Sequence, residues 1–111
     1  MARITYLELP VADTARAKAF YAAAFAWPTT DYGPTYAAAT TGGADVGFQA
    51  DPDERTAAPL AVIEVEDLDA AQTAVERAGG TITQPVFAFP GGRRFHFADP
   101  DGHELAVMQP D

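Results

Sequence analysis

The stretch Arg93–Gln109, RRFHFADPDGHELAVMQ, decides the fold of this chain. Polar and apolar residues alternate before the central DPDG, and an apolar strand pattern resumes after it. Alternation with a period of two on both sides of a Pro/Asp/Gly cluster predicts a β-hairpin. If the loop is five residues long, antiparallel pairing sets His96 opposite Ala106 and Arg94 opposite Met108.

The composition narrows the classes of function. A chain of 111 residues is expected to form a single domain spanning 1–111. Lys and Arg number 7 against 16 Asp and Glu, which gives a net charge of −9 and argues against a nucleic-acid partner. There is no cysteine, no apolar run long enough to span a bilayer and no signal-peptide pattern. We therefore expect a cytoplasmic protein without a membrane partner.

Outward from the hairpin, the chain alternates strand and helix patterns. Asp13 and Asp67 stand where N-caps of two helices would stand, since their carboxylates can accept from free amides of the first turn. Gly79 and Gly80 are expected to end the second helix. The strands expected before the hairpin cover 4–9, 35–39, 45–49, 60–65 and 81–84, and the helices run from 14 to about 25 and from 68 to about 78.

The first helix and the segment 86–92 each contain a cluster of apolar residues. Ala17, Phe20, Tyr21 and Phe25 recur at helical spacing and are expected to pack against a sheet. The segment 86–92, VFAFPGG, suits either a lid over a cavity or an ordinary surface loop.

The chain also contains an internal repeat. Val-Ala-Asp at 11–13 matches Val-Glu-Asp at 65–67, and Gly-Ala-Asp-Val at 43–46 matches Gly-His-Glu-Leu at 102–105, in the same order. The first module then spans about 3–50 and the second about 60–110. The polar, proline-flanked segment 51–59 is expected to be the linker.

Three motifs in this order resemble the vicinal oxygen chelate superfamily, which includes glyoxalase I, bleomycin-resistance proteins and extradiol dioxygenases. They are LELPVADTARAKAFYAAAFAW, IEVEDLDAAQTAVERAGG and FADPDGHELAV, and together they cover essentially the whole chain. The resemblance implies an α+β fold in which two βαβββ modules form a cup-shaped mixed sheet around a ligand cavity. It also implies a homodimer, with modules paired either within one chain or between chains.

The resemblance further implies one metal ligand from each of four strands. The corresponding positions here are Tyr6, Gly47, Leu60 and Ala106. They lack the carboxylate, imidazole and amide donors that divalent metals use, and a tyrosine alone does not make a site. We therefore expect no metal and no other cofactor. A less favoured alternative is an unconventional metal site formed by Glu8, His96 and Glu104.

The ligand cup is expected to be roomy, because small residues stand where the metal and its ligands would lie: Ala37, Ala39, Gly47 and Ala106. Strand alternation predicts which side chains line it. The expected lining is Tyr6, Glu8, Asp45, Gln49, Leu60, Val62, Arg94, His96, Glu104 and Met108.

Three functions remain open, and no catalytic residue is assigned. The first is a metal-free protein that binds a small organic ligand, as bleomycin-resistance proteins do; the acidic composition suits a cationic ligand. The second is a metal-independent enzyme with His96, Glu8 or Glu104 as acid or base and Arg94 as an anion clamp. The third, least supported by the ligand positions, is a metal-dependent lyase or dioxygenase. A degenerate domain with a structural role is the remaining alternative.

Overall fold

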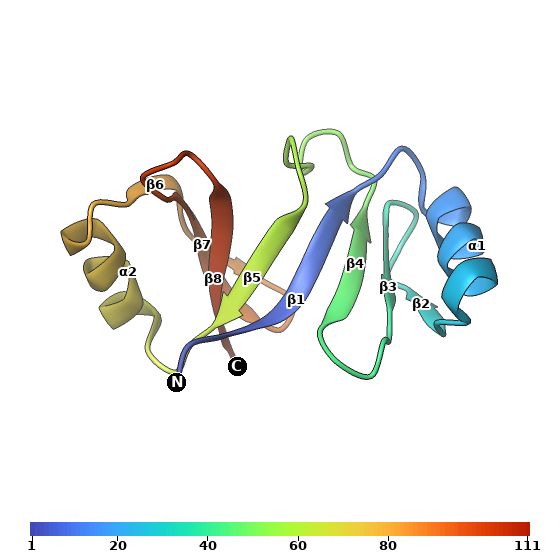
Figure 1. Cartoon of the computed structure of the whole chain (residues 1–111), viewed down its shortest axis with the longest axis horizontal. Helices are drawn as coiled ribbons and strands as arrows, with labels where there is room; N and C mark the ends of the chain where they lie inside the picture. Colours follow the sequence, from blue (N-terminus) through green and yellow to red (C-terminus); the bar gives the residue numbers. More distant parts are fainter. The chain divides into compact units, whose positions relative to one another are not determined.

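The computed structural model describes residues 1–111 and divides them into two compact units, Thr5–Leu60 and Met1–Ile4 together with Ala61–Asp111. Each unit is organised around one βαβββ module, as expected from the repeat (Figure 1). The α+β class is therefore confirmed. Neither helix is of a length and apolar character to cross a bilayer.

The first module has parallel and antiparallel pairs in the strand order β2-β3-β4-β1. β1 and β4 are parallel, whereas β3 pairs antiparallel with β2 and β4. In sequence order the elements are β1 (Arg3–Pro10), α1 (Thr14–Phe25), β2 (Thr29–Asp31), β3 (Tyr36–Ala39) and β4 (Asp45–Gln49). The short strand β2 was not expected from the sequence, because three residues after a Trp-Pro pair carry no alternation signal.

The second module repeats this arrangement in the strand order β5-β8-β7-β6. β5 and β8 are parallel, and β7 pairs antiparallel with β6 and β8. Its elements are β5 (Leu60–Glu64), α2 (Leu68–Arg77), β6 (Thr81–Phe89), β7 (Gly92–Ala98) and β8 (Glu104–Pro110). The connectivity of strand, helix and three strands is thus the same in both modules.

Both helices begin at the expected aspartates. The Asp13 side chain accepts from the backbone N–H of Arg16 at 2.7 Å, and the Asp67 side chain accepts from that of Ala70 at 3.0 Å. After α2, Gly79 adopts a φ of +100°, a left-handed conformation that an L side chain would disfavour. Local sequence therefore fixes where these helices start and where the second one stops.

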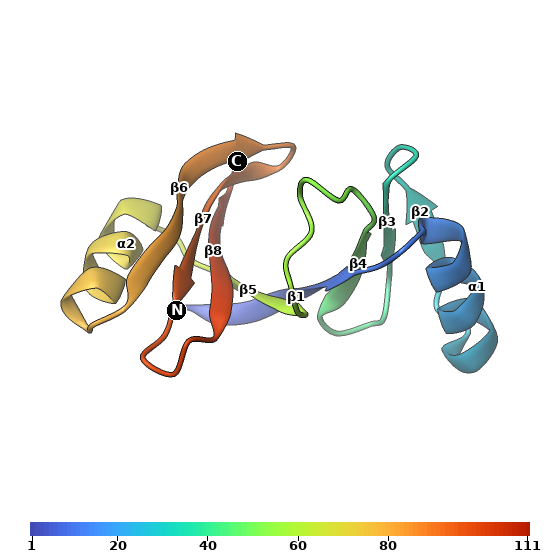
Figure 2. The same cartoon turned by 90° about the horizontal axis from the view of Figure 1, so that it is seen from above.

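In the first module α1 packs against β3 and β4. In both views it lies at the end of the module that carries β2 and β3 (Figures 1 and 2). Tyr21 stacks on the fully buried Phe48 at 5.4 Å between ring centroids. The helix nevertheless has no fully buried residue, and Phe20 and Phe25 are each 60% exposed. The expectation that these two phenylalanines pack against the sheet was wrong, because Tyr21 and Ala17 take that position.

Ala37 and Ala39 also differ from expectation. Both are buried in the hydrophobic core that includes Phe48 and Tyr21. They are small because the helix approaches the sheet there, not because they leave room for a ligand. On β3 the opposite face belongs to Tyr36.

The second module has a deeper core beneath its helix. Leu68 of α2, Phe95 and Val107 are almost completely buried, and Ile63 and Val75 pack against them. The α2 helix lies beside β6 in both views (Figures 1 and 2). This core holds the strands whose opposite face carries His96.

The hairpin of β7 and β8 has the register expected from the sequence. His96 faces Ala106 and Arg94 faces Met108 across β7 and β8. Neither the lid nor the surface loop expected for 86–92 is present as a separate loop, because residues up to Phe89 belong to β6, which pairs with β7. Register shifts on either side of Gln84 make this strand irregular, which disguised its pattern in the sequence.

Candidate functional site

A group of polar side chains occupies the face of the first module opposite α1. The parallel register pairs Tyr6 with Asp45 and Glu8 with Gly47, and residues paired in this way share a face. Tyr36 joins them from β3. We call Tyr6, Glu8, Tyr36, Asp45 and Gly47 the tyrosine face.

Hydrogen bonds link three of these side chains in a row. The Tyr36 hydroxyl donates to Glu8 Oε2 at 3.1 Å, and the Tyr6 and Tyr36 hydroxyl oxygens are 2.7 Å apart. Glu8 is only 3% exposed, and both tyrosines are half-buried. A buried carboxylate is costly unless hydrogen bonds stabilise it, and Tyr36 supplies one.

Glycine at position 47 is what allows this arrangement. A Cβ placed on Gly47 would meet the hydroxyl oxygens of both Tyr6 and Tyr36 far inside van der Waals contact. The space beside Gly47 is therefore filled by the two phenol groups. The expectation that Gly47 leaves the cup roomy was wrong, because the side chains of Tyr6 and Tyr36 occupy that space.

The environment keeps both phenols protonated. Burial raises the pKa of Tyr36 well above its usual range, and the neighbouring Glu8 carboxylate raises it further. Burial likewise raises the pKa of Tyr6, and Glu8, Tyr32 and Asp45 raise it further by smaller amounts. At physiological pH neither tyrosine is therefore suited to act as a phenolate base.

The other polar residues expected on this face have local partners. Asp45 Oδ1 accepts from the backbone N–H of Thr41 at 3.3 Å, which closes the loop before β4. Gln49 Oε1 accepts from the backbone N–H of Asp51 at 3.0 Å. Asp45 keeps a second carboxylate oxygen that this loop contact does not use.

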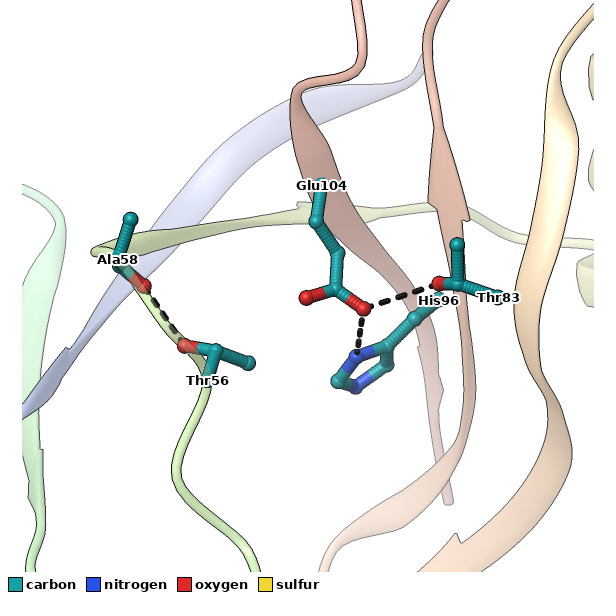
Figure 3. Close-up of polar contacts among 5 residues, drawn as sticks. All are labelled: Thr56, Ala58, Thr83, His96 and Glu104. Atoms are coloured by element: carbon teal, nitrogen blue, oxygen red, sulfur yellow. Dashed lines mark hydrogen bonds and ion pairs between the residues drawn. The ribbon is translucent and has the colours of Figure 1, made fainter.

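In the second module, His96, Glu104 and Thr83 form a cluster on three adjacent strands (Figure 3). Thr83 Oγ1 donates to Glu104 Oε2 at 2.9 Å, and His96 Nδ1 lies 3.4 Å from the same oxygen. The His96 side chain is 4% exposed and that of Glu104 37% exposed. The imidazole–carboxylate contact is long for a charge-assisted hydrogen bond, which normally measures under 3 Å.

Arg94 lies further along the same face of β7, among aromatic rings. Its Cζ is 5.2 Å from the ring centroid of Phe87 and 5.4 Å from that of Phe89, within the range of cation–π attraction. Phe87 also approaches His96, with 5.8 Å between ring centroids. The residues taken for a lid thus flank Arg94 and His96 directly.

The remaining expected lining residues are apolar. Leu60 is fully buried and Val62 is 4% exposed, while Met108 is half-buried. Val62 pairs with Ala106, and Met108 pairs with Arg94. These side chains contribute packing surface and no hydrogen-bonding atoms apart from the weak methionine sulfur.

The DPDG loop carries a different set of polar groups. Asp99 accepts from the backbone N–H groups of Asp101 and His103, both at 2.9 Å, and its second oxygen lies 3.0 Å from His103 Nδ1. These bonds lower the pKa of the Asp99 carboxyl, the backbone N–H of His103 contributing most. The aspartate therefore has a structural role in closing the loop.

The family model of the glyoxalase/bleomycin resistance protein/dioxygenase superfamily matches residues 3–107. The chain belongs to this superfamily. No curated protein matches the chain. The expected assignment to the vicinal oxygen chelate group is confirmed.

Solved structures share the fold at low sequence identity. The NAD-dependent benzaldehyde dehydrogenase from Legionella pneumophila superimposes with a TM-score of 0.78 at 20% identity, covering 96% of this chain and 98% of that one. A superfamily member from Vibrio splendidus 12B01 superimposes with a TM-score of 0.74 at 16% identity, and the match covers 100% of both chains. The Mn(II)-bound glyoxalase from Novosphingobium aromaticivorans superimposes with a TM-score of 0.70 at 24% identity, covering 98% of this chain and 40% of that one.

The residues at the superfamily's metal positions do not fit a metal ion. At Gly47 the neighbouring space is filled by phenol groups, and Tyr6 is engaged with Tyr36. Leu60 and Ala106 are completely buried and carry no donor atom. Soft and hard divalent ions alike need several carboxylate, imidazole or thiolate ligands, which these positions do not offer.

Sequence reasoning missed Tyr36, Thr83 and the two phenylalanines beside Arg94. Tyr36 lies in an alanine-rich strand whose assigned role was to leave space. The available signal was its alternation with Ala37 and Ala39, which places it on the face of Tyr6 once β3 pairs with β4. Thr83 and Phe87 could not be assigned to a face because of the register shifts in β6.

Proposed function

We propose that this protein is a metal-free binding protein for a small organic molecule, of the glyoxalase/bleomycin-resistance type. The observation that carries the proposal is the tyrosine face. Where the superfamily places metal ligands on β1 and β4, Tyr6 and Gly47 instead accommodate a hydrogen-bonded pair of neutral phenols. Such a face offers oriented hydrogen-bonding groups and aromatic surface, which small-molecule sites use for specificity.

The proposal is tested by calorimetry and thermal unfolding with bleomycin and with the glutathione hemithioacetal of methylglyoxal as probes. We expect saturable stabilisation by one of them that is the same with EDTA as without it. A ligand present at 100 times its Kd stabilises the folded state by about 2.7 kcal/mol. Mn²⁺, Ni²⁺ and Zn²⁺ alone are expected to leave the melting temperature unchanged.

The control variants are Glu104→Ala and Glu76→Ala, since Glu76 lies on the exposed surface of α2. Stabilisation by one of these metals that disappears in Glu104→Ala but persists in Glu76→Ala would contradict the proposal. It would support a metal-dependent lyase instead.

A second candidate function, a metal-independent acid–base enzyme, is favoured by the His96–Glu104–Thr83 cluster. A buried imidazole beside a carboxylate is a recurrent acid–base arrangement, and Thr83 orients the carboxylate. This candidate predicts turnover of the hemithioacetal in EDTA with a bell-shaped pH profile that His96→Ala abolishes. Binding without turnover would leave the binding function as the better description.

We also propose that the protein forms homodimers, as the resemblance to its superfamily implies. Phe20 and Phe25 on α1 provide a probe, because both are 60% exposed. Sedimentation is expected to give twice the chain mass of 11.7 kDa. A monomer at micromolar concentration would contradict the proposal, and dissociation of the dimer by Phe20→Glu would locate the contact on α1.

A further inference from the structure

The direction of the hydrogen-bond chain on the tyrosine face limits what it can recognise. Each phenol has a single O–H proton, and a carboxylate has none. Tyr36 donates its one proton to Glu8, so in this arrangement the bond between the phenols takes its proton from Tyr6. The Tyr6 oxygen then has only lone pairs to offer a ligand.

The neighbouring polar group on this face is also an acceptor. Asp45 pairs with Tyr6 in the register of β1 and β4, and one of its carboxylate oxygens is not used by the contact with Thr41. Burial and the adjacent carboxylates raise the pKa of Tyr6, so its proton stays in the chain at physiological pH. Acceptor atoms and negative charge thus come together on the tyrosine face.

From this arrangement we infer that the tyrosine face binds a protonated amine, with the ammonium N–H groups donating to Tyr6 Oη and Asp45. The inference rests on the proposed binding function and adds the chemical class of its ligand. An ammonium group matches the site in two ways: it donates hydrogen bonds, and it is cationic. A neutral or anionic ligand that must accept a hydrogen bond would find no partner in Tyr6.

The test compares three probes of similar size in the presence of EDTA: benzylammonium, benzyltrimethylammonium and benzyl alcohol. Their Kd values are measured by ligand-observed NMR titration. We expect benzylammonium to bind at least about tenfold more tightly than benzyl alcohol, because a charged donor forms the stronger hydrogen bond. Benzyltrimethylammonium keeps the charge but lacks N–H donors, and is expected to fall between them.

The decisive variant is Tyr36→Phe, which leaves the net charge unchanged. Tyr6 then loses the acceptor for its proton and becomes able to donate to a ligand. The preference for benzylammonium over benzyl alcohol is expected to fall to twofold or less. Tyr21→Phe is the matched control, since Tyr21 stacks on Phe48 on the opposite side of the sheet, and it should keep the full preference.

The outcomes separate this inference from the proposed function. Equal affinities for the ammonium and the alcohol, no saturable binding of any probe, or a preference that Tyr36→Phe leaves intact would overturn the inference. The metal-free binding of other ligands would stand in those cases. A requirement for Mn²⁺ in the binding of any of the three probes would overturn both the inference and the proposed function. Circular dichroism and the melting temperature verify that each variant is folded.

Discussion

The two modules repeat one connectivity but use the face opposite the helix differently. In the first module, phenols hydrogen-bond to each other and to a buried carboxylate. In the second, a buried imidazole and a threonine converge on a glutamate that is 37% exposed. The helix sides differ as well: α2 buries Leu68 completely, whereas α1 buries no residue completely. Duplication has thus preserved the backbone pattern while the side chains have diverged.

The largest effect on stability is expected from removing one buried aromatic ring from the core of each module. Phe95→Ala and Phe48→Ala each remove a fully buried ring and should lower the free energy of unfolding by about 3–5 kcal/mol. We expect the greater loss for Phe95, because Leu68 of α2 beside it is fully buried, whereas Tyr21 of α1 beside Phe48 is only partly buried and can move into the vacated space. Urea denaturation measures the difference. Tyr32→Ala, at a site that is 67% exposed, serves as the control, and a greater loss for Phe48 would reverse the ranking of the modules.

A smaller effect is expected from adding one methyl group to the tyrosine face. Gly47→Ala should cost about 1–3 kcal/mol, because its Cβ collides with the two phenol oxygens. Gly43→Ala is the matched control, since nothing lies within 4 Å of the added atom and the backbone there has no positive φ. Thermal and urea unfolding give the two values.

The same substitution can be repeated in a Tyr6→Phe/Tyr36→Phe background. Removal of the two hydroxyl groups should recover much of the lost stability, which a double-mutant comparison reports as coupling. Gly92→Ala in the second module meets the backbone carbonyl of Gln109 instead, so no side-chain change should rescue it. Equal costs with and without the hydroxyl groups would show that the phenols do not fill the space beside Gly47.

Alkaline pH should lower the stability of the first module, because Tyr6 and Tyr36 are held in the protonated form in the folded state. The fold raises the pKa of Tyr6 and Tyr36 above the usual value of about 10, so the folded state favours the protonated form. The resulting stabilisation is complete below pH 10 and is lost as pH rises above it. Tyr36→Phe should cost about 1 kcal/mol at pH 7 through its lost hydrogen bonds, and should weaken the loss of stability above pH 10.

The measurement is chemical denaturation between pH 7 and pH 11, with tyrosinate absorbance recorded in parallel. Tyr21→Phe is the control, and its pH dependence should match that of the unmodified protein. Ionisation of all four tyrosines near pH 10 in the folded protein would contradict the raised pKa values.

The smallest expected difference concerns the two helix caps. Asp13→Ala and Asp67→Ala should each cost about 1 kcal/mol, because each removes the acceptor for a first-turn N–H. Substitution by Asn should preserve most of the stability in both modules, since its side-chain oxygen still accepts. Guanidinium denaturation is precise enough to compare the caps. A negligible cost at Asp13 would show that the packing of Ala17 and Tyr21, and not the cap, stabilises α1.

The sequence by itself determined the elements whose causes are local. Aspartate caps, the Gly79 stop and the period-two alternation around DPDG fixed both helices and the register of β7 and β8. Repeated motifs fixed the modular organisation and the superfamily. Each of these features depends on residues close together in the chain, and so it can be read without knowing what lies across the sheet.

Only the tertiary structure decided the chemistry of the tyrosine face. Tyr36 and Glu8 are 28 residues apart, and their meeting depends on β3 and β1 both pairing with β4. The sequence shows that residue 47 is a glycine, but it does not show whether the space beside it is empty. The side chains of Tyr6 and Tyr36, which are far from Gly47 in the sequence, fill that space. Register shifts in β6 likewise hid Thr83 and Phe87, because one inserted residue reverses the face to which every later side chain points.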